Sequence, residues 1–151
     1  MTCSSCTVSG LVDTDLSLTL PSGKATVLVK GPSANGKFAG DYPLGTEVCL
    51  EEIPWAPDLS KHRQAVLSAV VAIHIRGGHP HLNRVRLTFR GIEYRGFSPK
   101  DVNVYQGSNV FDDTTWTAVP RAQRLEDVNG NAVGSTVLLA HGNLIVLTAK
   151  T

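Results

Sequence analysis

Residues 64–94 carry the pattern that decides the fold: QAVLSAVVAIHIRGGHPHLNRVRLTFRGIEY. Between Arg84 and Arg90 apolar and polar residues alternate strictly. The apolar positions are Val85, Leu87 and Phe89, and the polar positions include Arg84, Arg86 and Arg90. A period of two is typical of an antiparallel strand with one buried face. The segment therefore predicts a strand that turns a row of arginines away from the core.

The apolar run before this strand, residues 65–75, fits a strand or a helix by spacing alone. We favour a strand, because the run is rich in β-branched residues and ends at Gly77 and Gly78. The two strands are then expected to form a hairpin around the GGHPHLN turn. At Gly91 the alternation changes phase, which predicts a β-bulge.

Similar strand signals, separated by turn residues, recur along the rest of the chain. They lie at residues 16–20, 24–30, 46–53, 101–106, 123–128, 132–140 and 144–148. The first two are expected to pair as a hairpin, Asn129-Gly130 predicts a second tight turn, and the last two strands predict a hairpin that is apolar on both faces. The fold class is therefore all-β: an antiparallel β-sandwich, jelly-roll or Ig-like, or a barrel, with roughly eight to ten strands.

Length and composition indicate the number of domains. The 151 residues, 42% of them hydrophobic, predict a single β domain over residues 1–151. No apolar run approaches the length of a membrane-spanning helix, and no signal peptide is expected from the residues after Met1.

Charge is unevenly distributed, although the net charge is only +1. Residues 60–100 hold eight basic residues and one acid, residues 1–59 hold three and seven, and residues 101–151 hold three and five. A basic middle between acidic flanks predicts ion pairing within the chain, or oppositely charged surfaces that dock between subunits.

The three cysteines, Cys3, Cys6 and Cys49, allow three states. The C-x-x-C pair could contribute half of a zinc site, but a second pair is absent. A disulfide from Cys3 or Cys6 to Cys49 would form in an oxidising compartment. We favour free, partly buried thiols, the third state.

Other motifs lack residues that their chemistry requires. Residues 31–38 imitate a phosphate-binding loop, but Phe38 replaces the hydroxyl residue that would coordinate magnesium. Residues 127–131 imitate the start of a calcium loop without its glycine and closing glutamate. The histidines of this region, His74, His79 and His81, are interpreted as polar turn residues among arginines that repel a cation. We therefore predict no metal, no cofactor, no catalytic residue and no enzymatic activity.

Five residues are candidates for contact with a partner: Arg84, Arg86, Arg90, Trp55 and Trp116. For Trp55, between two prolines, we favour a lid over the core edge, with an exposed contact residue as the alternative.

The leading hypothesis is a structural assembly protein that forms homo-oligomers or joins a larger lattice: a virion decoration or minor capsid protein, or a surface or filament subunit. The alternative is a secreted Ig-like binding module for a glycan or a protein. Nucleic-acid contact along the arginines is a weaker third hypothesis. The expected location is a virion, the extracellular space or a cell surface.

Overall fold

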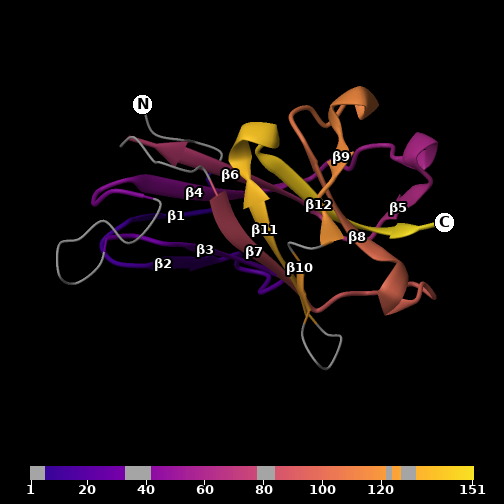
Figure 1. Ribbon diagram of the computed structural model, residues 1–151, viewed down its shortest axis with the longest axis horizontal. Helices are drawn as coiled ribbons and strands as arrows, with labels where there is room; N and C mark the ends of the chain where they lie inside the picture. Colours follow the sequence, from indigo (N-terminus) through magenta and orange to yellow (C-terminus); the bar gives the residue numbers. More distant parts are fainter. Residues whose placement is uncertain (1–5, 33–41, 78–83, 122–123, 127–131) are drawn as a thin grey trace.

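The computed structural model describes residues 6–32, 42–77, 84–121, 124–126 and 132–151. These residues form two antiparallel sheets that pack face to face (Figure 1). The larger sheet has seven strands in the order β1-β4-β6-β12-β8-β9, with β5 also paired to β12, and the smaller has five in the order β10-β11-β7-β3-β2. Neither order closes on itself within the described residues. The prediction of an all-β antiparallel sandwich is therefore confirmed.

The seven-stranded sheet contains β1 (Val8–Leu11), β4 (Glu47–Ile53), β5 (Gln64–Val66), β6 (Val70–Arg76), β8 (Val102–Gly107), β9 (Thr117–Ala118) and β12 (Leu144–Lys150). The five-stranded sheet contains β2 (Leu16–Thr19), β3 (Ala25–Val29), β7 (Arg84–Arg90), β10 (Arg124–Glu126) and β11 (Ala132–Leu138). Short 3-10 turns lie between them: η1 (Ser60–His62), η2 (Pro99–Asp101), η3 (Asp113–Thr115) and η5 (Leu139–His141). Several strands have only two or three residues, which explains why there are more strands than the sequence predicts.

The main core fills the space between the inner faces of the two sheets. The five-stranded sheet contributes Val27, Val29, Val85, Leu87 and Phe89, and the seven-stranded sheet contributes Val48, Leu50, Ile73, Ile145 and Leu147, among others. Their burial follows the period of two that the sequence shows in β7. Burial of these side chains is the main source of the sandwich's stability.

A second apolar cluster covers the outer face of the seven-stranded sheet. It contains Leu59, Val70, Ala72, Tyr105, Trp116, Leu144 and Val146. The segments after β4 and β8 supply Leu59 and Trp116, and these two side chains cover the sheet. Because this sheet is buried on both faces, successive residues of β6 and β12 are apolar.

Two predicted hairpins are wrong. The strands β6 and β7 do not pair, because β6 belongs to the seven-stranded sheet and β7 to the five-stranded sheet. The chain also changes sheets between β11 and β12, through η5. The pairs β2–β3 and β10–β11 are antiparallel neighbours, as predicted, whereas the predicted turn at Asn129-Gly130 lies outside the described residues.

Residues 65–75 are extended and not helical, as predicted, but they belong to two strands. Both β5 and β6 pair with β12, and residues 67–69 interrupt the regular pairing between them, although Leu67 and Ser68 still form hydrogen bonds with Leu147. The predicted bulge at Gly91 is also wrong, because β7 ends at Arg90 and Gly91 opens the following loop with φ +60°. Strand β1 was not predicted, since its four residues carry only weak alternation.

Candidate functional site

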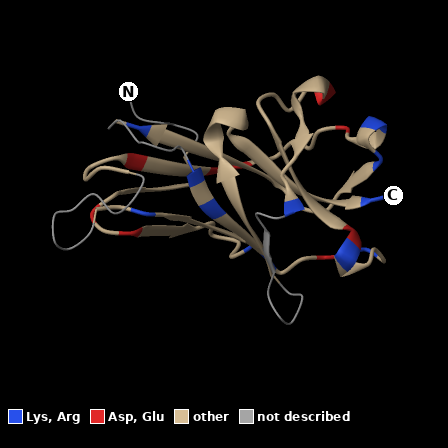
Figure 2. Cartoon of the chain, viewed as in Figure 1, with Lys and Arg blue, Asp and Glu red and all other residues tan. Residues whose placement is uncertain are grey.

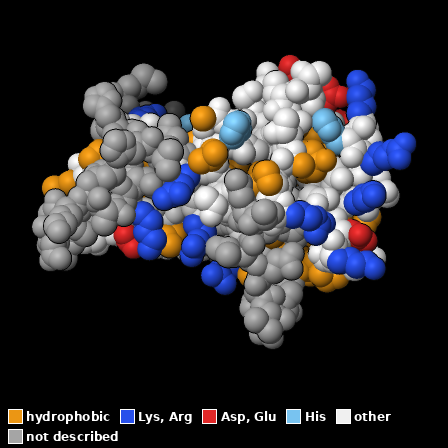
Figure 3. All heavy atoms as spheres, in the orientation of Figure 1, with side chains coloured by type: hydrophobic (Ala, Val, Ile, Leu, Met, Phe, Trp, Pro, Cys, Tyr) orange, Lys and Arg blue, Asp and Glu red, His pale blue; other side chains and the backbone are white. Residues whose placement is uncertain are grey.

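Three exposed arginines of β7, Arg84, Arg86 and Arg90, form what we call the arginine row. The row lies on the outer face of the five-stranded sheet, between β11 and β3 (Figure 2). In the space-filling view, Lys and Arg side chains lie at the lower left and near the middle of the visible surface, and others lie along its right-hand side (Figure 3). Arg86 stands opposite Thr136 on β11 and Leu28 on β3, so its neighbours across the sheet are uncharged.

Some of the charges around the arginine row are paired with acids. The Lys30 ammonium lies 2.9 Å from a carboxylate oxygen of Asp15, and this hydrogen bond holds the pKa of Asp15 below its usual range. No ion pair joins Arg86 or Arg90 to an acid whose side chain the structure describes. A shallow hollow of about 300 Å³ lies between Lys30, Arg84 and Arg86. Guanidinium groups arranged in this way suit a carboxylate or another oxyanion on a partner.

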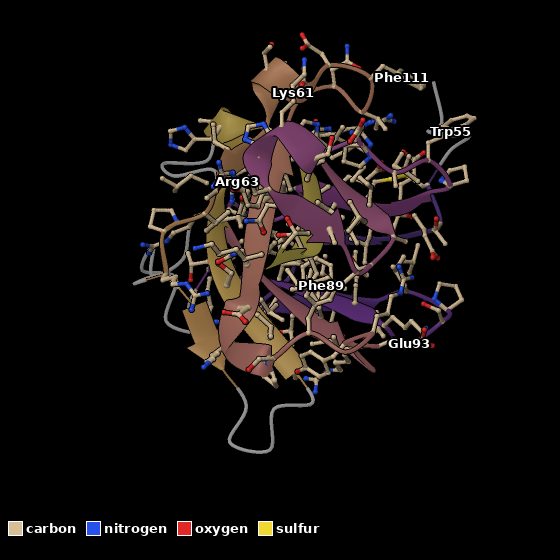
Figure 4. The ribbon with its side chains drawn as sticks, turned by 90° about the vertical axis from the view of Figure 1, so that its right-hand side faces the viewer. Trp55, Lys61, Arg63, Phe89, Glu93 and Phe111 are labelled. Carbon is tan, nitrogen blue, oxygen red and sulfur yellow. A yellow bond between two sulfur atoms is a disulfide. The ribbon has the colours of Figure 1, made fainter. Side chains whose placement is uncertain are left out.

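Trp55 and Phe111 form an exposed aromatic pair at one end of the molecule (Figure 4). Their side chains are 61% and 82% exposed, and the ring centroids lie 6.2 Å apart at a tilt of 48°. The favoured interpretation of Trp55 as a lid is therefore wrong. The outer face of the seven-stranded sheet is instead covered by Leu59 and Trp116.

Trp116, by contrast, is buried, whereas a residue that contacts a partner must be exposed. It is 1% exposed, and its indole Nε1 donates a hydrogen bond to the Asn109 carbonyl oxygen at 2.9 Å. Its ring lies directly over Gly107, where a Cβ atom would come within 2.5 Å of the indole. Trp116 is a core residue and does not reach a surface where a partner binds.

Cys6 and Cys49 form a disulfide, so the expectation of free thiols is wrong for these two residues. The bond links the N-terminal segment to β4 across 43 positions of sequence. Cys3 lies outside the described residues. Disulfides are typical of oxidising compartments, which points to an oxidising environment for this chain.

The remaining sequence motifs place no metal centre in the described part of the chain. His74 is half-buried on β6, with Nε2 3.6 Å from Glu51 Oε1. His79, His81, most of the loop-like stretch 31–38 and residues 127–131 lie outside the described residues. Within the described ranges no three His, Cys, Asp or Glu side chains gather as metal ligands.

A pocket that the sequence did not predict opens between the two sheets, beside the end of β7. Its volume is about 450 Å³. The segments that line it are residues 20–25, 66–71 and 89–95, with Glu52, Ala56 and Leu147. They are far apart in the sequence, so no local motif marks the pocket.

No protein-family model and no curated protein matches the chain. None of the described helices has the length and apolarity to cross a bilayer.

Proposed function

We propose that this chain is a non-enzymatic structural subunit that docks into a larger protein assembly through the outer face of its five-stranded sheet. The arginine row is the observation that carries this proposal. The assembly is a homo-oligomer or a larger lattice, such as a virion that this chain decorates or joins as a minor capsid protein, or a cell-surface layer or filament.

The two sheets differ in a way that supports this choice. The seven-stranded sheet has its outer face covered by apolar side chains of this chain, whereas Arg84, Arg86 and Arg90 leave the other sheet's outer face polar and exposed. Arginine binds carboxylates through two parallel hydrogen bonds, so the matching surface on the partner is acidic. A second copy can offer acids, because residues 1–59 carry a net charge of −4.

The disulfide supports the proposed location. A Cys6–Cys49 bond persists outside the reducing cytosol, as in a virion, the extracellular space or on a cell surface. Charge-based docking also explains how a subunit with a small net charge can assemble, since segregated charges of opposite sign attract at short range.

Reversal of one charge in the arginine row tests the proposal. We expect the wild-type protein to form assemblies in sedimentation velocity at low salt, and these should dissociate as salt screens the charges. Arg86→Glu should remain monomeric at low salt, because it places a carboxylate where the partner's acids dock.

Arg63→Glu is the matched control, since it changes the net charge equally at an exposed position outside the row. It should assemble like the wild type. A wild-type protein that stays monomeric at every salt concentration would contradict the proposal. Retention on heparin that Arg86→Glu abolishes, without assembly, would instead indicate contact with a nucleic acid or another polyanion.

The aromatic pair favours a second candidate function, a secreted binding module for a glycan or a protein. Exposed Trp and Phe rings that contact each other offer an apolar platform of the kind found at binding hot spots. Trp55→Ala should abolish binding on a glycan array while changing the free energy of unfolding by no more than about 0.5 kcal/mol, because the side chain is exposed.

Leu44→Ala serves as the control for the aromatic pair, because Leu44 is an equally exposed apolar residue outside it. Its binding should equal that of the wild type. If Trp55→Ala binds every ligand as the wild type does, the aromatic pair has no part in recognition.

A further inference from the structure

The inter-sheet pocket has an apolar interior. Its inner wall is formed by core residues of both sheets: Leu20, Ala25, Leu67, Val71, Phe89 and Leu147. Figure 4 looks toward this end of the molecule, with Phe89 in the interior and Glu93 at the margin. The volume of about 450 Å³ falls within the range of roughly 300–1,000 Å³ that is typical of small-molecule sites.

The backbone keeps this space open. Residues 67–69 separate β5 from β6, with Leu67 and Ser68 still bonded to Leu147 of β12, and Gly91, with φ +60°, begins a left-handed turn directly after β7. Ser68, Ala69 and Gly91 are small, and a Cβ on Gly91 would meet only a Lys24 carbon at 3.9 Å. The space between these segments is therefore left unfilled by side chains of the described residues and opens to solvent.

The mouth of the pocket carries more positive than negative charge. Lys24, Arg90 and Arg95 line it together with Glu52 and Glu93. Glu93 lies 3.8 Å from the Lys24 ammonium, and both side chains are well exposed. Arg95 donates to the Val66 carbonyl oxygen at 3.3 Å, which holds its guanidinium beside the mouth. No acid whose side chain is described forms an ion pair with Arg90 or Arg95.

We infer that this pocket binds a small amphiphile with an apolar chain or ring and a single anionic head group. The apolar part enters between the sheets against Phe89 and Leu147, and the head group binds Arg90 and Arg95 at the mouth. The apolar wall provides affinity by burial, and the guanidinium groups select the sign of the head-group charge. The pocket shares Arg90 with the arginine row, whereas Arg95 lies outside the row, so a change at Arg95 tests the pocket without altering the row.

Three probes with the same chain and different head groups test the inference: octanoate, octanol and octyltrimethylammonium. In isothermal titration calorimetry below the micelle concentration, octanoate should bind the wild-type protein. Octanol should bind roughly tenfold more weakly, because it lacks the charge-assisted hydrogen bonds. The ammonium probe should bind least of all, since its charge faces arginines.

Arg95→Glu should weaken octanoate binding by roughly tenfold or more. Arg63→Glu is a closely matched control: Arg63 and Arg95 are both exposed arginines with positive φ, 55° and 51°, and Arg63 does not line the pocket. The two variants thus share the backbone strain and the change in net charge. Only Arg95→Glu should affect binding.

Ala69→Trp provides an independent test of the location. Ala69 is exposed at the mouth, so a large ring there should close the pocket without disturbing the core, and octanoate binding should be lost at an unchanged melting temperature. The inference is overturned if the wild type does not bind octanoate, if the ammonium probe binds equally well, or if Arg95→Glu and Arg63→Glu bind alike. Loss of assembly in Arg86→Glu has no bearing on these outcomes.

Discussion

Replacement of Trp116 by alanine should lower the free energy of unfolding by about 3–5 kcal/mol, as is usual for truncation of a fully buried large aromatic residue. Trp116 is among the largest fully buried side chains and packs in the outer apolar cluster of the seven-stranded sheet. Because its ring lies directly on the Gly107 backbone, its loss leaves a cavity that neighbouring side chains cannot fill without moving β8. Urea denaturation followed by circular dichroism measures this loss.

Two comparisons separate burial from other causes. Trp116→Phe keeps an aromatic ring but loses the indole hydrogen bond to the Asn109 carbonyl oxygen, so its loss of stability should be smaller than that of the alanine variant. Trp55→Ala makes the same chemical change at an exposed position and should leave the unfolding midpoint almost unchanged. Equal destabilisation at Trp55 and Trp116 would show that the assignment of one to solvent and the other to the core is wrong.

The two tryptophans also show where sequence reasoning reaches its limit. Both lie in loop segments, and nothing in the neighbouring residues distinguishes the buried ring from the exposed one. Trp116 is buried because Gly107, on β8, leaves room for its ring, and this contact exists only in the folded chain. The signal is a glycine in a strand, which often marks the close approach of another group.

The strand patterns correctly predict which face of a strand is buried, but they predict poorly which strands pair with each other. The alternation in β7 correctly predicts that Val85, Leu87 and Phe89 are buried and that the arginine row is exposed. Alternation does not reveal to which of the two sheets a strand belongs, or which strands it pairs with. A strand that crosses to the other sheet buries the same face as one that turns back in a hairpin, so β6–β7 and β11–β12 were assigned to the wrong pairing.

Loss of the disulfide is the second change for which we expect a large effect. The bond spans 43 positions, and closure of a loop of that length in the unfolded chain corresponds to about 4 kcal/mol at room temperature in the chain-entropy model. It also holds β1 in place: in the described residues this short edge strand pairs only with β4, where Cys49 lies opposite Ser9. Without the bond, we expect β1 to separate from β4 before the rest of the sandwich unfolds.

The Cys3→Ser/Cys6→Ser double variant removes the disulfide and also prevents Cys3 from replacing Cys6 as the partner of Cys49. Its denaturation midpoint should fall well below that of the wild type and should not respond to reductant. Cys3→Ser alone is the matched control, because it keeps the Cys6–Cys49 bond. Its midpoint should match that of the wild type, and reductant should lower both midpoints equally. If the double variant and the oxidised wild type unfold at the same midpoint, the bond adds nothing to stability.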